Sequence, residues 1–185
     1  MGRTFEALTP ALTLFIEAQH LFFVATAPEG NDGHVNLSPK GCDTLRVLDE
    51  RRLVYLDLTG SGIETVAHLR QNGRITLLFA AFDGPPQLVR VWGRGEAVPR
   101  RDDRFGDLAA LFDELAGTRA VIDVTIERVG TSCGYGVPLH RYEGERDRLV
   151  QGLEARGPDG VATYWAKHNE TSIDGLPGLV PAGEA

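Results

Sequence analysis

The sequence has few of the residues that build disulfide frameworks or metal sites. Its 185 residues include two cysteines, Cys42 and Cys133, which lie far apart and form no Cys-x-x-Cys pair. Such sparse cysteine is typical of a reducing compartment, so we expect a cytoplasmic protein with two ordinary thiols. The five histidines show no ligand spacing, which gives metal binding little support.

Long apolar runs and an excess of positive charge are also absent. No stretch reaches the roughly 18 apolar residues of a transmembrane helix, and the N-terminal MGRTFEALTP lacks the apolar segment of a secretory signal. The 26 acidic residues outnumber the 19 basic ones, which gives a formal net charge of -7. This balance argues against nucleic acid or an anionic membrane as the main partner. It still allows one small anionic ligand in a local pocket of donors.

The residues that are present predict a small, mainly β (α+β) protein. Hydrophobic residues make up 42% and charged residues 24% of the chain, ordinary values for a globular fold. Alternating or β-rich runs predict six antiparallel strands with short hairpins, which suggests a small barrel. The predicted strands are 21–27, 34–40, 51–58, 74–82, 87–98 and 120–129. We expect residues 1–142 to form the main domain and residues 143–185 a helical extension packed on it.

Helices are expected beside these strands. Thr9 can cap a first helix that has Pro10 at its first position, and residues 63–73 and 102–117 show apolar residues at helical spacing. Two polar helices are expected between Glu143 and Asn169. The tail from 172 to 185 is expected to be extended and to fray at its end.

The stretch HVNLSPKG carries polar groups where a strand should alternate. Val35 and Leu37 can face the core, whereas Asn36, Ser38 and Lys40 line up on the other face. The two interpretations are an ordinary solvent-facing strand end and a row of hydrogen-bond donors held ready for a ligand.

The loop TGSG, from Thr59 to Gly62, follows the strand that ends near Asp57 and opens a helix. Its glycines allow peptide N–H groups to turn outward, and a helix N-terminus favours negative charge. Together with Lys40 the loop is suited to a phosphate. The alternative is a plain strand–helix turn with Ser61 as the cap.

In order along the chain, the motifs VNLSPKG, RLVYLDLTGSG, HLRQNGRITLLF and VRVWGRG resemble the pyridoxamine 5'-phosphate oxidase-like family of flavin-binding split barrels. The resemblance covers about residues 19–99, with looser agreement in the strand around Ile122, and CGYGVP matches a branch of uncertain substrate. It implies a six-stranded antiparallel split β-barrel with flanking helices that binds FMN at a homodimer interface. It further implies a flavin-dependent oxidoreductase acting on an unidentified small-molecule substrate.

The resemblance also implies a set of cofactor contacts. Asn36, Ser38 and Lys40 would meet the flavin ring or its ribityl chain, and residues matching 59–65 would approach the phosphate. The second subunit would close the site, through Trp92 or the CGYGVP turn. The full set of expected cofactor-binding residues is Asn36, Ser38, Lys40, Asp57, Thr59, Ser61, Gly62, Thr65 and Trp92.

Two departures from the family's pattern bear on function. The oxidases carry an Arg-Lys pair at the start of the helix, where this chain has Glu64 and Thr65, so a phosphate must rely on Lys40, Ser61, Thr65, backbone N–H groups and Arg46. The C-terminal Arg-x-His arrangement that recognises pyridoxine phosphate is not reproduced in LHRYEGERDRL. We therefore expect a substrate other than pyridoxamine phosphate.

No catalytic side chain stands out. The chain shows no Ser-His-Asp arrangement, no close carboxylate pair and no dinucleotide fingerprint, and His68 fits a surface or packing role better than that of a base. This suits a flavoprotein, because the cofactor carries the electron chemistry. Two alternatives remain, a deazaflavin-dependent reductase and a non-catalytic flavin-binding module.

Overall fold

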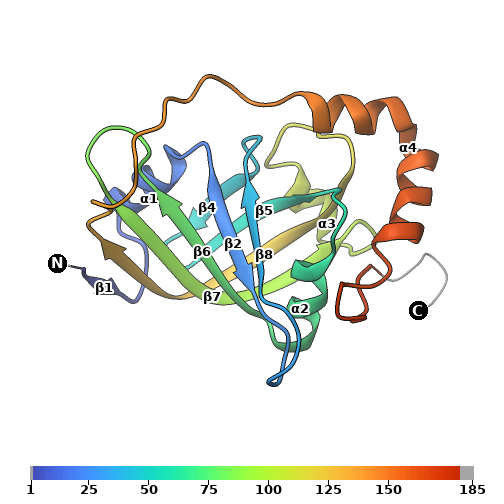
Figure 1. The fold of residues 1–185 in the computed structure, drawn as a ribbon, viewed down its shortest axis with the longest axis horizontal. Helices are drawn as coiled ribbons and strands as arrows, with labels where there is room; N and C mark the ends of the chain where they lie inside the picture. Colours follow the sequence, from blue (N-terminus) through green and yellow to red (C-terminus); the bar gives the residue numbers. More distant parts are fainter. Residues whose placement is uncertain (1, 180–185) are drawn as a thin grey trace.

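The computed structural model describes residues 2–179, in which one curved antiparallel sheet is flanked by helices (Figure 1). The strands are β1 (Thr4–Phe5), β2 (Phe22–Thr26), β3 (Asn36–Lys40), β4 (Leu45–Asp49), β5 (Arg52–Leu58), β6 (Arg74–Ala80), β7 (Leu88–Pro99) and β8 (Thr118–Ser132). The helices are α1 (Pro10–Glu17), α2 (Glu64–Asn72), α3 (Phe105–Ala109) and α4 (Arg148–His168). The mainly β class with flanking helices is confirmed.

The strand order in the sheet is β3-β2-β6-β7-β8-β5-β4, and β1 adds to β8 outside this path. All six predicted strands are present, as β2, β3 and β5 to β8, and two more were missed. β1 has only two residues, too few for a pattern, and most side chains of β4 are half-buried, so that its sequence does not alternate.

Two apolar clusters pack against the sheet. The larger one lies on the concave side and includes Phe22, Tyr55, Leu77 and Val91. The smaller one lies on the other face of β5, where α3 covers Val54, Leu56 and their neighbours. Because β5 is buried on both faces, its strand reads as a continuous apolar run that ends at a buried acid, Asp57.

A gap separates the two ends of the sheet. β4 begins its pairing where Leu45 lies opposite Tyr55, so Asp57 and Leu58 at the end of β5 have no partner in β4. On the other side of the gap, β3 pairs only with β2. Lys40 of β3 reaches across, with its ammonium 3.5 Å from the carboxylate of Asp57. The barrel is thus split between β3 and the end of β5.

The expectation that Val35 and Leu37 face the core is wrong. Both side chains are exposed, by 73% and 67%, whereas Asn36, Ser38 and Lys40 are half-buried on the inner face. The physical reason is that β3 is an edge strand beside the gap. Its inner face lines a polar cavity rather than the apolar core, and its apolar residues are left on the outside.

The predicted helices are all present, but their lengths differ from the prediction in one case. Thr9 caps α1 through its hydroxyl and Pro10 opens the helix, as predicted, and α2 ends at Gly73 in the left-handed conformation. The helix expected over 102–117 shrinks to α3, and residues 110–117 form turns and irregular chain that lead through Gly117 (φ 76°) into β8. Within α4, Gly157 takes a non-helical conformation before Pro158, which divides it into the two expected helical stretches, starting at Arg148.

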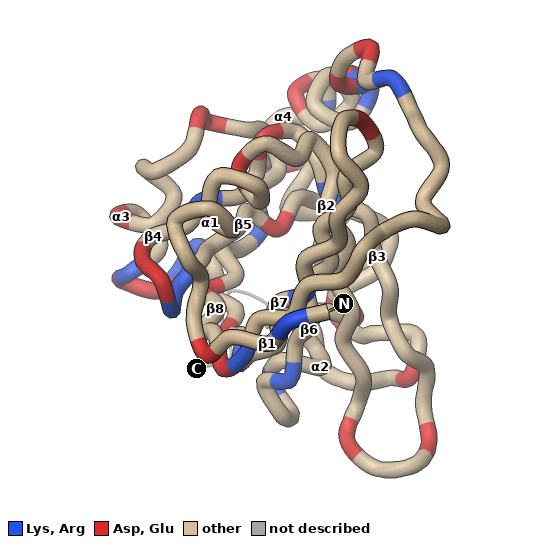
Figure 2. Tube along the Cα trace, turned by 90° about the vertical axis from the view of Figure 1, so that its left-hand side faces the viewer, with Lys and Arg blue, Asp and Glu red and all other residues tan. Residues whose placement is uncertain are grey.

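The surface charges are intermixed. Near β4, β8 and α3, basic and acidic positions alternate along the trace (Figure 2), and ion pairs join Arg52 to Asp123 and Arg104 to Glu96. These charges therefore neutralise one another locally. Among the described residues, the helices are too short or too polar to cross a bilayer. The proposed division of the chain at residue 142 stays a prediction.

Candidate functional site

A polar cavity of about 590 Å³ opens at the gap in the barrel. Its walls are β3, the end of β5, the loop before α2 and the segment that follows α4. Seven of the nine residues predicted from the sequence line it together. They are Asn36, Ser38, Lys40, Asp57, Ser61, Gly62 and Thr65.

The polar row of β3 is held in one orientation by hydrogen bonds. Asn36 Nδ2 donates to Thr65 Oγ1 at 3.0 Å and to Thr26 Oγ1 at 3.3 Å, and its Oδ1 accepts from Ser38 Oγ at 2.9 Å. The amide therefore cannot turn without losing partners on both sides. This supports the interpretation of the stretch as a prepared row of polar groups rather than a frayed strand end.

His68 on α2 contacts Thr26, one of the partners of this polar row. Its side chain is fully buried, and Nδ1 lies 3.0 Å from Thr26 Oγ1. The Thr26 hydroxyl thus accepts from Asn36 Nδ2 and lies within hydrogen-bond distance of His68 Nδ1, whereas His68 Nε2 has no hydrogen-bond partner among the described residues. Burial lowers the pKa of His68 from its usual value, partly opposed by Asp174 and Glu64. His68 is thus a neutral packing residue, in agreement with the prediction.

A buried group of three charges forms the floor of the cavity. The side chain of Asp57 is 1% exposed. Its Oδ2 accepts from Arg119 Nε at 2.9 Å, and its Oδ1 faces the ammonium of Lys40 at 3.5 Å without forming a hydrogen bond. Arg119 was missed by the sequence reasoning. It stands directly before the alternating run of β8, and the pattern of that run carries no sign of a side chain aimed into the gap.

The loop before α2 offers peptide N–H groups. Arg119 Nη1 donates to Gly62 O at 2.8 Å and Asn169 Nδ2 donates to Gly60 O at 3.1 Å, so these two loop carbonyls are already held. Within the described chain, the N–H groups of residues 60–63 donate to no acceptor. Such free N–H groups suit an anion. The alternative with Ser61 as cap is wrong, because the N-cap position is Ile63 and no side chain caps the helix.

Glu64 lies over its own helix N-terminus. Its carboxylate is folded so closely above Gly62 that a Cβ there would collide with it, and Oε1 accepts the N–H of Ile173 at 3.2 Å. A larger residue at position 62 would push this carboxylate aside. An acidic side chain therefore stands at the helix N-terminus where the sequence comparison placed the first residue of the family's Arg-Lys pair.

Residues 169–179, called here the C-terminal strap, close one side of the cavity. Thr171, Ser172 and Ile173 line it. The strap turns back on itself through a bridge between Thr171 and Pro177, and a hydrogen bond of 2.7 Å joins His34 Nδ1 to Asp174 Oδ1. The expected extended tail is therefore a folded turn up to residue 179. The predicted fraying of residues 180–185 lies outside the described residues.

Two predicted contacts and Arg46 lie outside this cavity. Thr59 accepts from Trp165 Nε1 at 2.7 Å and donates to Gly117 O, so its hydroxyl holds α4 against the barrel. Trp92, on β7, packs against Gly130 and is 38% exposed. Its contact with a flavin bound by a second copy stays a prediction. Arg46 is paired with Asp43.

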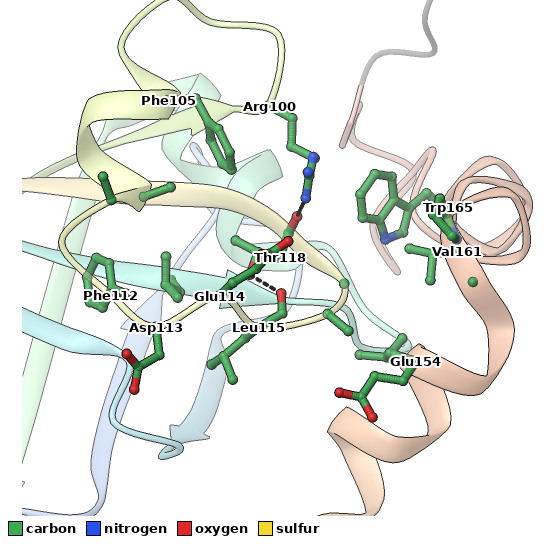
Figure 3. A pocket seen from close by; sticks show the side chains of 18 residues that line it. Arg100, Phe105, Phe112, Asp113, Glu114, Leu115, Thr118, Glu154, Val161 and Trp165 are labelled. Carbon is green, nitrogen blue, oxygen red and sulfur yellow. Dashed lines mark hydrogen bonds between the residues drawn. The ribbon is translucent and has the colours of Figure 1, made fainter.

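A second cavity, of about 580 Å³, lies between the α3 region and α4 (Figure 3). Phe105, Phe112 and Leu115 line one wall, and Val161 and Trp165 of α4 line the other. It is mainly apolar and shares Trp165 with the Thr59 contact described above. Its chemistry differs from the polar cavity at the gap.

The described residues form no metal site and no paired cysteines. No cluster of three His, Cys, Asp or Glu side chains is arranged to hold a metal ion there. Cys42 and Cys133 are both free thiols. Burial, reinforced by Glu145, raises the pKa of Cys42, which makes it less reactive than an ordinary thiol.

Known proteins with similar sequences and folds share this architecture. A protein from Aspergillus flavus named pyridoxamine 5'-phosphate oxidase family protein ustO is 36% identical over 192 residues, covering 95% of this chain and 77% of that protein. A crystal structure from Lactobacillus delbrueckii, described as a candidate pyridoxamine 5'-phosphate oxidase, is 25% identical with a TM-score of 0.53 and covers 68% of this chain and 94% of that one. HupZ from Group A Streptococcus is 23% identical, with a TM-score of 0.53 over 66% of this chain and 91% of that chain, and shows the same fold.

The sequence model of the pyridoxamine 5'-phosphate oxidase family matches residues 8–133, which include every strand from β2 to β8. The match spans the cavity from β3 to α2 and Arg119 on β8. The chain belongs to the pyridoxamine 5'-phosphate oxidase family.

Proposed function

We propose that this protein binds FMN in the cavity at the gap and acts as a flavin-dependent oxidoreductase on a small molecule other than pyridoxamine phosphate. The observation that carries the proposal is the convergence of three features on one cavity. These are the oriented polar row of β3, the buried charges around Asp57 and the free N–H groups of residues 60–63. Family membership supports a flavin as the ligand.

The residues present fit such a cofactor. A cavity of about 590 Å³ falls within the roughly 300–1,000 Å³ of small-molecule sites. Asn36 and Ser38 supply polar atoms suited to a hydroxylated chain or a heteroaromatic edge. Lys40, Arg119 and the N–H groups of the loop supply the positive charge and donors that a phosphate monoester requires.

When bound, the flavin would supply the electron transfer, and the chain would supply position and electrostatics. The hydrogen bonds from Asn36 to Thr26 and Thr65 fix the polar row before a ligand arrives, so little ordering cost remains at binding. Lys40 places one ammonium at the open edge of β3. The proposal gives no titratable side chain a role in proton transfer.

A second copy of the chain is part of the proposal. Val35 and Leu37 stay exposed on the outer face of an edge strand, an arrangement that soluble proteins normally cover. A homodimer that covers β3 would bury these side chains and close the open side of the cavity. The free thiols suit the cytoplasmic location that we propose.

Titration of the purified protein with FMN, followed by flavin fluorescence, tests the binding step. Addition of NADH or NADPH without oxygen, and then of an electron acceptor, tests the enzymatic step. Bleaching and recovery of the flavin absorbance at a useful rate would support an oxidoreductase. Stable binding without reduction would favour the non-catalytic flavin-binding module, and preference for a deazaflavin in a parallel titration would favour the reductase alternative.

A further inference from the structure

We propose that Arg119 is the residue that binds the flavin phosphate in this protein, taking the place of the Arg-Lys pair that the chain lacks. The inference rests on the proposed function, since it assigns one part of the same cavity. It moves the phosphate from the end of α2 to the side of the cavity formed by β8, β5 and β3.

The end of α2 already holds an anion. Glu64 lies in the first turn of the helix, its carboxylate covers Gly62, and the N–H of Ile173 binds it. This carboxylate takes the favourable interaction with the helix dipole. A phosphate placed beside it would be repelled, so the positive charge must come from another element.

Arg119 has the geometry for this role. It is 5% exposed and lines the cavity. Nε binds Asp57, and Nη1 binds both Gly62 O and Asn169 Oδ1. Nη2 makes no hydrogen bond to the described residues, so one arm of a rigid guanidinium fork stays available. Guanidinium groups held in this way recognise phosphate oxygens well.

The β3, β5 and β8 side of the cavity carries two positive charges and one negative charge, although Glu64 at the end of α2 makes the charges of the whole lining balance. Asp57 lies between Lys40 and Arg119 and compensates one of their two charges. The remaining positive charge lies beside the free N–H groups of residues 60–63, because Arg119 itself holds the carbonyl of Gly62. Arg119 thus contributes a charge to the phosphate and also orients the loop that donates to it.

The test compares FMN with riboflavin, which has the same ring and ribityl chain but no phosphate. Dissociation constants for both ligands are measured by flavin fluorescence for the unchanged protein and for Arg119→Gln and Arg119→Lys. Asn169→Ala removes the other clamp on the loop and keeps the charge of Arg119. Arg46→Gln removes a charge that is paired with Asp43 outside the cavity. Circular dichroism melting confirms that each variant is folded.

We expect Arg119→Gln to weaken FMN binding by about 10- to 100-fold, the usual effect of losing a charge-assisted hydrogen bond. Riboflavin binding should change little, Arg119→Lys should recover part of the loss, and the control Arg46→Gln should keep the preference for FMN. Asn169→Ala loses one loop contact and one partner of Arg119, so it should lose less of this preference than Arg119→Gln. If Arg119→Gln is unfolded, the same comparison is made with Arg119→Lys at rising salt, where the preference for FMN should fall.

Three results would overturn the inference. An unchanged ratio of FMN to riboflavin affinity in a folded Arg119 variant would show that Arg119 does not contact the phosphate. If Asn169→Ala lowers this ratio as much as Arg119→Gln does, Arg119 acts only by positioning the loop. If the unchanged protein binds neither flavin, the proposed function itself fails, and the inference fails with it.

Discussion

Lys40 is one of only two lysines in the chain, and the other, Lys167, lies exposed near the end of α4. Lys40 is different because its ammonium spans the gap between β3 and β5 and faces the buried carboxylate of Asp57. Replacing Lys40 by Ala should weaken FMN binding about tenfold or more, since a charged donor is lost from the cavity. Fluorescence titration with FMN measures this effect.

Lys167→Ala serves as the matched control and should bind FMN as the unchanged protein does. The fold should tolerate the loss of Lys40, because Arg119 continues to pair with Asp57. Equal FMN affinity in Lys40→Ala and Lys167→Ala would contradict a role for Lys40.

His68 gives the protein a dependence on pH. Burial lowers its native pKa, so between that value and the unfolded value of about 6.5 the unfolded chain binds more protons than the native one. The free energy of unfolding should therefore fall as the pH drops below about 6.5, and level off above it. The slope from this one group is at most about 1.4 kcal/mol per pH unit.

Urea unfolding between pH 5 and 8 measures that slope in the unchanged protein and in His68→Gln. The variant loses stability at every pH, but its slope in this window should be smaller, because the titrating group is gone. Identical slopes would show that His68 does not carry the effect.

At the scale of residues, the sequence predicts most of the cavity but misses part of its charge. The alternation in VNLSPK places Asn36, Ser38 and Lys40 on one face, and the structure brings these three together with the TGSG loop. Arg119 and residues 171–173 could not be found in this way. They reach the cavity only through the register of β8 and the fold of the strap, and both are set by contacts distant in sequence.

At the scale of elements, residues 172–175 in the middle of the C-terminal strap have few contacts with the barrel, whereas the two ends of the strap are anchored through Asn169 and through the hydrogen bond from Arg70 Nη1 to Gly178 O. Ile173 N donates to Glu64 Oε1, and Asp174 pairs with His34. Replacing Glu64 by Ala should release this side of the cavity, at a cost of about 1 kcal/mol for one hydrogen bond. Hydrogen–deuterium exchange should then be faster at residues 171–175.

Glu64→Gln is the control, because its amide oxygen still accepts the N–H of Ile173. We expect exchange in this variant to stay close to that of the unchanged protein. Slow exchange in Glu64→Ala would mean that the other anchors hold the strap without Glu64.

Elements with strong local signals were predicted well, and elements fixed by distant packing were not. The Thr9 and Pro10 signal places α1 correctly, and the six predicted strands all form. α3 is shorter than the apolar spacing over 102–117 predicts, and the residues after Ala109 instead form the irregular connection into β8. β4 lacks alternation because it is half-buried along most of its length.

At the scale of the whole molecule, the outer face of β3 argues for self-association. Leu37 is 67% exposed on an edge strand that also lines the cavity. Leu37→Asp should shift the proposed dimer towards monomer and weaken FMN binding with it, because the proposed second copy would close the site. Sedimentation velocity over a range of concentrations measures the first effect.

Leu14→Asp is a matched control, since Leu14 is 69% exposed on α1, away from the cavity. It should leave both the association state and FMN affinity unchanged. A protein that sediments as a monomer at all concentrations, and still binds FMN tightly, would contradict the proposed interface site.

The central claim is that the cavity between β3, β5 and α2 holds FMN, and the visible absorption spectrum tests it most directly. Freshly purified protein should show a flavin spectrum, or acquire one on incubation with FMN and gel filtration, and the released chromophore should have the mass of FMN. The folded Arg119→Gln variant should retain less of it. A colourless protein that takes up no FMN under these conditions would contradict the claim.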